Sequence, residues 1–235
     1  MKLIIDIRYY PSKIDNYGYD TYLGSPYSID GKAASTVLMR FVLKLREIGF
    51  CLPDFNHIYV SLSPSLEENE IQKLDNNDPY HKFHRDFCVG VSPGYFNSLS
   101  ENEKQALLIE KAVAVIQRYY CESDEEKAKI SHCAKVILEN GVNERIIFKE
   151  KKAEHCSVQI IVSVLDFNTF KASTRIMRGD EVVKEIEYPE TLNQFELPFQ
   201  FGSITIGKKA VTIKPKKNSF SPLYDFGELK YDLSE

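Results

Sequence analysis

The residue types best suited to chemistry gather in one stretch, PYHKFHRDFCVGV, at positions 79–91. Imidazole, carboxylate and thiol groups occur there within a dozen positions, at His81, His84, Asp86 and Cys88. Such groups can hold a metal ion or transfer protons. Three interpretations therefore compete for this stretch: a metal site, an acid–base site, and a strand with no chemical role.

The alternation of the apolar residues in this stretch predicts a strand with one side towards the core, formed by Phe83, Phe87, Val89 and Val91. An odd separation reverses a side chain in a strand, so His81 and His84 project from opposite faces. His84 and Cys88 share a face but stand about 13 Å apart, whereas zinc ligands lie about 2.0–2.3 Å from the metal. Only His84 and Asp86, about 6–7 Å apart along one face, are placed to interact. We therefore expect no metal and no other cofactor.

Standard catalytic signatures do not occur elsewhere in the sequence. It contains no GxSxG, GxGxxG, GxxxxGK[ST] or HExxH pattern. Catalytic residues can still be gathered from distant segments, as in Ser-His-Asp triads. An enzyme with such a composite site, a hydrolase or nuclease that uses His81 or His84, therefore stays open as an alternative.

The periodicity of residues 1–143 predicts a mixed α/β portion. Strands are expected over the first ten residues, with Leu3, Ile5 and Ile7 on one side, and over residues 57–63. Apolar residues at helical spacing predict three helices, near 32–48, 101–120 and 124–139. The second and third follow Ser-x-x-Glu capping boxes that begin at Ser100 and Ser123.

From residue 144 onward the period changes to two. Short alternating runs follow one another with turn residues between them, and Gly179–Asp180 has the form of a two-residue hairpin turn. This pattern is typical of an antiparallel meander or a barrel-like sheet. We therefore expect an α+β protein, with a three-helix portion at 1–143 and an antiparallel β portion at 144–235, as two domains or as one continuous domain.

Composition and charge bear on the partner. The chain of 235 residues is 43% hydrophobic and 27% charged, as ordinary globular proteins are, and its formal net charge is −4. Residues 1–143 hold 16 Lys/Arg against 20 Asp/Glu, whereas residues 144–235 hold 14 of each. Affinity for nucleic acid rests on cationic contacts to phosphates, so we expect no nucleic-acid ligand. A basic partner protein suits this charge better.

Other features bear on the compartment. The N-terminal MKLIIDIRYY does not resemble a signal peptide, because Asp6 and Arg8 interrupt its apolar run. No stretch approaches the ~20 apolar residues that a membrane span requires. The five cysteines are odd in number and form no CxxC pair, which argues against a disulfide framework and fits a reducing environment. We expect a cytoplasmic protein that does not enter a membrane.

The segment 9–30 is the most informative stretch for recognition, because it contains six of the fourteen tyrosines together with three aspartates. Tyrosine offers a large apolar area with few rotatable bonds and a polar tip, which is why recognition surfaces use it heavily. We predict that a partner is contacted by Tyr17, Tyr19, Asp20, Tyr22 and Tyr27. The alternative is that this long loop folds back and packs its tyrosines over the sheet.

This layout resembles that of immunity proteins from bacterial polymorphic-toxin and contact-dependent inhibition systems. The resemblance is carried by HIYVSLSPSL leading to VGVSPGYFNSLSENEKQALLIEKAVAVI, by the Tyr- and Asp-rich loop, and by an acidic α+β chain without a catalytic motif. It implies a cytosolic protein that binds a secreted toxin domain, here a basic nuclease, and blocks its active site. It assigns no role to any single residue. The composite-site enzyme and a structural or scaffolding protein remain the alternatives.

Overall fold

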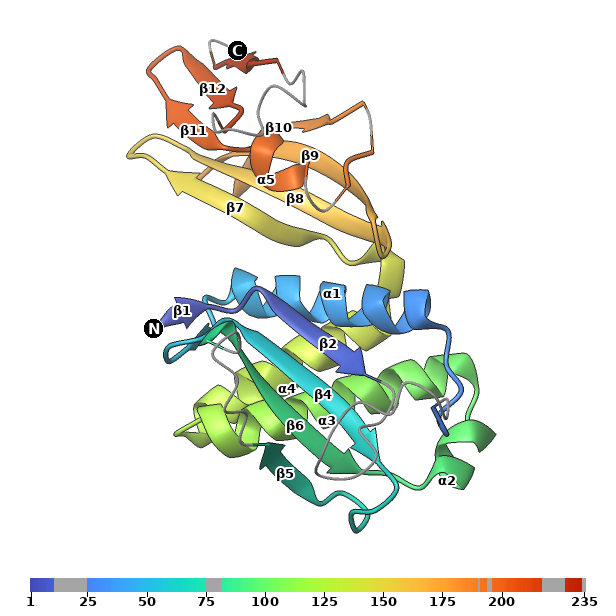
Figure 1. Cartoon of the computed structure of the whole chain (residues 1–235). Coiled ribbons are helices and arrows are strands. Elements are labelled where there is room, and N and C mark those ends of the chain that lie inside the picture. Colours follow the sequence, from blue (N-terminus) through green and yellow to red (C-terminus); the bar gives the residue numbers. More distant parts are fainter. Residues whose placement is uncertain (11–24, 75–81, 190, 194–195, 217–226, 234–235) are drawn as a thin grey trace. The chain divides into compact units, whose positions relative to one another are not determined.

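A computed structural model describes residues 1–10, 25–74, 82–189, 191–193, 196–216 and 227–233 (Figure 1). Tyr17, Tyr19, Asp20, Tyr22 and His81 lie outside these ranges. The chain divides into two compact units, an N-terminal unit Met1–Gly141 and a C-terminal unit Val142–Glu235. The division falls close to residue 143, where the periodicity of the sequence changes from helical to alternating.

A four-stranded sheet forms the centre of the N-terminal unit, in the order β2-β4-β6-β5. Its strands are β2 (Asp6–Tyr10), β4 (His57–Ser63), β5 (Ile71–Leu74) and β6 (His84–Gly90). β2, β4 and β6 run parallel, and β5 joins β6 antiparallel. A second, two-stranded pair consists of β1 (Lys2–Leu3) and β3 (Cys51–Leu52). Parallel neighbours need a long connection, and α1 (Gly31–Glu47) supplies it between β2 and β4.

Four helices accompany this sheet: α1, α2 (Pro93–Ser98), α3 (Glu101–Tyr120) and α4 (Asp124–Asn140). Both predicted capping boxes are present. The hydroxyls of Ser100 and Ser123 each accept a hydrogen bond from the main-chain N–H three residues later, and the glutamate at that position accepts one from the main-chain N–H of the serine. α4 ends at Gly141, whose positive φ of 53° suits glycine best. α1, α3 and α4 contact one another and lie on one side of the sheet (Figure 1).

Two expectations for the N-terminal strands need correction. Leu3 and Ile5 are 38% and 46% exposed, whereas Ile4 is fully buried. The reason is that the chain leaves β1 after Leu3 and pairs again only from Asp6, so the alternation restarts between the two strands. Phe83 was expected to face the core but is 58% exposed, because it lies in a short turn ahead of β6.

The C-terminal unit contains the expected meander, in the order β10-β9-β8-β7. Its strands are β7 (Ile146–Lys152), β8 (Ser157–Asp166), β9 (Thr169–Arg178) and β10 (Glu181–Glu187). Gly179, at a φ of 59°, occupies the two-residue turn between Arg178 and Glu181, which pair with each other. Alternating residues of β8 and β9 are buried, among them Val158, Ile160, Val162, Phe170 and Ile176.

The C-terminal unit is not a single meander, which corrects the expected architecture. A second, three-stranded sheet consists of β11 (Ser203–Ile206), β12 (Ala210–Lys214) and β13 (Leu229–Asp232), and α5 (Leu197–Gln200) precedes it. The described residues thus form five α-helices rather than three, in an α+β fold with several sheets. α2 and α5 escaped the sequence pattern because six and four residues are too few to show a helical period. None of the described helices is both long and apolar enough for a membrane span.

Candidate functional site

One face of the N-terminal sheet is apolar and packs against helices. Leu62 of β4 belongs to a buried cluster with Leu107 and Leu108 of α3, and the ring of Phe87 in β6 lies 5.1 Å from that of Tyr119. Successive side chains in a strand point to opposite faces. The other face therefore carries the residues in between, which we call the polar face: Asp6, Arg8, Tyr10, His57, Tyr59, Ser61, His84, Asp86 and Cys88.

The register of the parallel strands arranges the polar face in rows. His57 in β4 is the partner of His84 in β6, so the two imidazoles stand side by side in one row. In the next row, Tyr59 lies between Arg8 and Asp86. Neighbouring strands are about 4.8 Å apart, so side chains of the same row and of adjacent rows lie within reach of one another. This arrangement gathers ionisable groups from three strands that are far apart in the sequence.

Tyr59 is the centre of the contacts on this face. Its ring stacks on that of His84, with the centroids 4.4 Å apart and an interplanar angle of 27°. Tyr10 approaches Tyr59 edge-on at 5.3 Å, and the guanidinium of Arg8 lies 5.6 Å from the centre of the same ring. Each ring is therefore held by neighbours on adjacent strands, and we call Tyr10, Tyr59 and His84 the ring cluster.

Ionisable groups on the polar face lie in two close pairs. Nε2 of His84 lies 3.4 Å from Oδ2 of Asp86, and Nε of Arg8 lies 2.5 Å from Oδ2 of Asp6. The side chains of His84 and Asp86 are 13% and 7% exposed, whereas that of Arg8 is 55% exposed. Burial raises the pKa of the Tyr59 hydroxyl although the Arg8 charge opposes this, so the phenol stays neutral and can donate a hydrogen bond.

The His84–Asp86 contact was predicted from the strand period and is confirmed. A carboxylate beside an imidazole orients the ring and stabilises its charged form, which is the basis of acid–base pairs. At 3.4 Å the pair lies outside ordinary hydrogen-bond range. Ser61 and Cys88, which pair across β4 and β6, share this face as buried groups. Within the described residues, no three His, Cys, Asp or Glu side chains converge as a metal site would require.

Tyr27, one of the predicted partner contacts, lies in the core. Its side chain is 3% exposed, its hydroxyl donates a 2.7 Å hydrogen bond to the Val91 carbonyl, and its ring meets Phe96 edge-on at 5.4 Å. The packing alternative therefore describes Tyr27, which is unavailable to a partner in this structure. The other four predicted contacts, Tyr17, Tyr19, Asp20 and Tyr22, fall outside the described residues.

Sequence reasoning missed Arg8, Tyr10, His57 and Tyr59 as members of the same face. A signal for them was present: in HIYVSLS, His57, Tyr59 and Ser61 alternate with an apolar set, just as His84, Asp86 and Cys88 do in the neighbouring strand. What the alternation does not state is that the two strands are parallel neighbours in register.

Comparisons of this chain with protein-family models, with curated proteins and with solved structures find no match.

Proposed function

We propose that this chain is a cytosolic immunity-type protein, which binds a cognate toxin domain, a basic nuclease, and blocks its active site. The observation that carries the proposal is the ring cluster. Aromatic residues and arginine are enriched among the residues that dominate interface energies. Here the Tyr59 ring is in contact with the rings of Tyr10 and His84 and lies beside the Arg8 guanidinium. Rings that are already ordered lose less conformational entropy when a partner binds.

The sequence joins this cluster to the predicted contact loop. Tyr10 is the last residue of β2 and leads into the part of the Tyr- and Asp-rich segment 9–30 that contains Tyr17, Tyr19, Asp20 and Tyr22. We propose that the polar face and this segment form one contact surface. Charge supports a basic partner, because the acidic excess of the chain falls entirely before residue 144. Complementary charge accelerates encounter and limits wrong pairings.

The test begins with a search for a toxin-like reading frame immediately upstream of this gene, whose encoded domain is then the candidate partner. Growth of a bacterial host that expresses that domain should stop, and co-expression of this chain should restore it. The two purified proteins are then titrated by calorimetry at low and high salt. Changing both Tyr10 and Tyr59 to alanine should weaken binding by about a thousandfold, since each anchor contributes ~2 kcal/mol.

Tyr95→Ala is the matched control, because Tyr95 is a 51% exposed tyrosine of the same unit that lies on α2 and not on the polar face. It should bind with unchanged affinity. Tyr17→Ala with Tyr22→Ala tests the loop separately. Asp20→Lys should mainly slow association and alter its salt dependence. If both double tyrosine variants bind normally, this surface is not the contact surface. If they bind weakly only because they melt early, these tyrosines stabilise the fold and do not contact the partner.

A second candidate function is favoured by the His84–Asp86 contact alone, namely a hydrolase or nuclease with His84 as its base. In that case the purified chain should cleave a nucleic acid or an ester without any partner, and His84→Gln should abolish the cleavage. Asp86→Asn should shift its pH profile, because the carboxylate stabilises the imidazolium. The absence of cleavage by the unmodified chain, together with toxin binding by His84→Gln, would exclude this candidate.

A further inference from the structure

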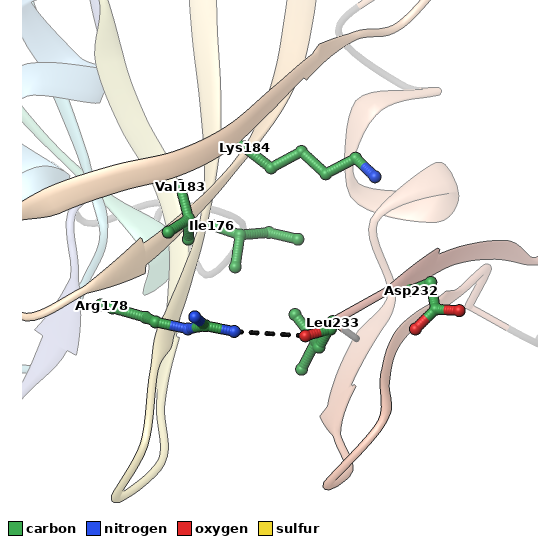
Figure 2. Close-up of a pocket in the computed structure, with 6 residues that line it drawn as sticks. All are labelled: Ile176, Arg178, Val183, Lys184, Asp232 and Leu233. Atoms are coloured by element: carbon green, nitrogen blue, oxygen red, sulfur yellow. Dashed lines mark hydrogen bonds between the residues drawn. The ribbon is translucent and has the colours of Figure 1, made fainter. Parts of the chain in front are cut away.

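The C-terminal unit has a pocket of about 160 Å³ beside the β9–β10 hairpin. It is lined by Ile176, Arg178, Val183, Lys184, Asp232 and Leu233 (Figure 2). Ile176 and Arg178 come from β9, Val183 and Lys184 from β10, and Asp232 and Leu233 from the end of β13 and the residue after it. Two different sheets of the unit therefore contribute walls.

A β-bulge in β10 lies at this pocket. In a regular strand the consecutive residues Val183 and Lys184 would point to opposite faces of the sheet. The pairing of β10 with β9 shifts between Val182 and Lys184, so both Val183 and Lys184 line the pocket. Bulges commonly re-aim side chains beside binding sites, and this one turns an aliphatic group and an ammonium towards the same space.

The walls combine an apolar base with two cations. Ile176 is fully buried, whereas Val183 remains 40% exposed. Lys184 and Arg178 extend on opposite sides of these aliphatic groups (Figure 2). Nη2 of Arg178 donates to the Leu233 carbonyl at 3.2 Å, which uses one of the five guanidinium donors. Within the described part of the chain, the Lys184 ammonium has no hydrogen bond or ion pair.

We propose that this pocket binds a carboxylate that carries a branched aliphatic group, either the C-terminal residue of a peptide or a free short-chain acid. A cavity of about 150 Å³ accommodates one benzene ring, so a pocket of this size accommodates one leucine-sized group. Guanidinium and ammonium groups are suited to a carboxylate. Lys184 and Arg178 are the two cations among the lining residues and Asp232 is the one carboxylate, so the lining carries a net charge of +1, which attracts an anion.

The direct test is a calorimetric titration of the full chain with three probes: N-acetyl-leucine, isovalerate and N-acetyl-leucinamide. The two acids should bind with dissociation constants on the order of 1 mM, the range expected for ligands of so few atoms. The amide, which lacks the negative charge, should bind at least about fivefold more weakly. Tighter binding of N-acetyl-leucine than of isovalerate identifies a peptide terminus as the ligand, and the reverse order identifies a free acid. The absence of saturable binding by both acids, or equal binding of the amide, overturns the proposal.

Two matched pairs of variants locate the binding. Lys184→Gln should weaken binding of the acids about fivefold. Lys171→Gln removes the same charge from the exposed position 171 on β9, outside the pocket, and should leave binding unchanged. Val183→Trp should block the pocket and abolish binding, whereas Val182→Trp, one residue away and 46% exposed, should not. Equal effects within either pair overturn the assignment, and thermal melts show whether each variant is folded.

Discussion

Two tyrosines of the N-terminal unit whose hydroxyl groups are buried should respond differently to the same chemical change. The Tyr27 hydroxyl donates to the Val91 carbonyl at 2.7 Å. The Tyr9 hydroxyl is also buried but has no hydrogen-bond partner among the described residues, although its ring packs against the same apolar cluster. Replacing each tyrosine with phenylalanine removes one oxygen atom and leaves the ring. The structure therefore offers an internally controlled measurement of one hydrogen bond.

The magnitudes follow from the two environments. Tyr27→Phe removes a buried hydrogen bond and leaves a carbonyl without that donor, which should lower the free energy of unfolding by about 1–2 kcal/mol. Tyr9→Phe removes a hydroxyl that is desolvated without compensation, so the free energy of unfolding should stay unchanged or rise by about 1 kcal/mol. The two variants should thus differ by about 1–3 kcal/mol, and a difference of about 2 kcal/mol is roughly thirtyfold in the unfolding equilibrium.

Urea unfolding followed by far-UV circular dichroism is the suitable assay. The three longest helices all lie in Met1–Gly141, whereas α5 of the other unit has four residues, so the helical signal reports the N-terminal unit. Each midpoint is compared at an unchanged m-value, which ensures that stability and not compactness has changed. Equal destabilisation by both changes would mean that the Tyr9 hydroxyl has a partner outside the described residues. No effect of Tyr27→Phe would refute the assigned hydrogen bond.

Two further predictions concern the same unit. Gly90→Ala should lower the stability of this unit by about 3 kcal/mol or more, because the added Cβ would lie 1.7 Å from the Glu67 carbonyl oxygen. Gly94→Ala is the control, since a Cβ there meets nothing closer than 3.8 Å and should be tolerated. Urea unfolding of both variants measures the difference. Stability should also fall as the pH rises from about 10 to about 12, since burial, aided by the nearby Glu68 charge, raises the pKa of Tyr27 to about 12 from the usual 10.0. The folded state holds the Tyr27 proton more tightly than the unfolded state, so this contribution to stability is complete below pH 10 and is lost progressively between pH 10 and about 12. In a pH series of thermal melts, Tyr27→Phe should lose less stability over this range than the unmodified chain. An identical loss in both would contradict the raised pKa of Tyr27.

Local patterns in the sequence determined the regular elements. The helical spacing and the two capping boxes located α1, α3 and α4 within one or two residues, because a helix shows both its buried face and its first turn in consecutive residues. The change to a period of two after Gly141 identified the antiparallel strands β7 to β10 for the same reason. The contact between His84 and Asp86 followed from the strand period alone, since both residues lie on one face of one strand.

Only the tertiary structure decided which strands are neighbours and which side chains are covered. His57 stands beside His84, and Tyr59 stacks on His84, because β4 and β6 pair in parallel register although twenty residues separate the two strands. The burial of Tyr27 likewise depends on Phe96 and Leu107, which lie about seventy to eighty positions away in the sequence. The bulge that places Val183 and Lys184 together is a property of pairing with β9. Such contacts depend on the packing of distant segments, and local periodicity specifies only the face of an element on which a residue lies.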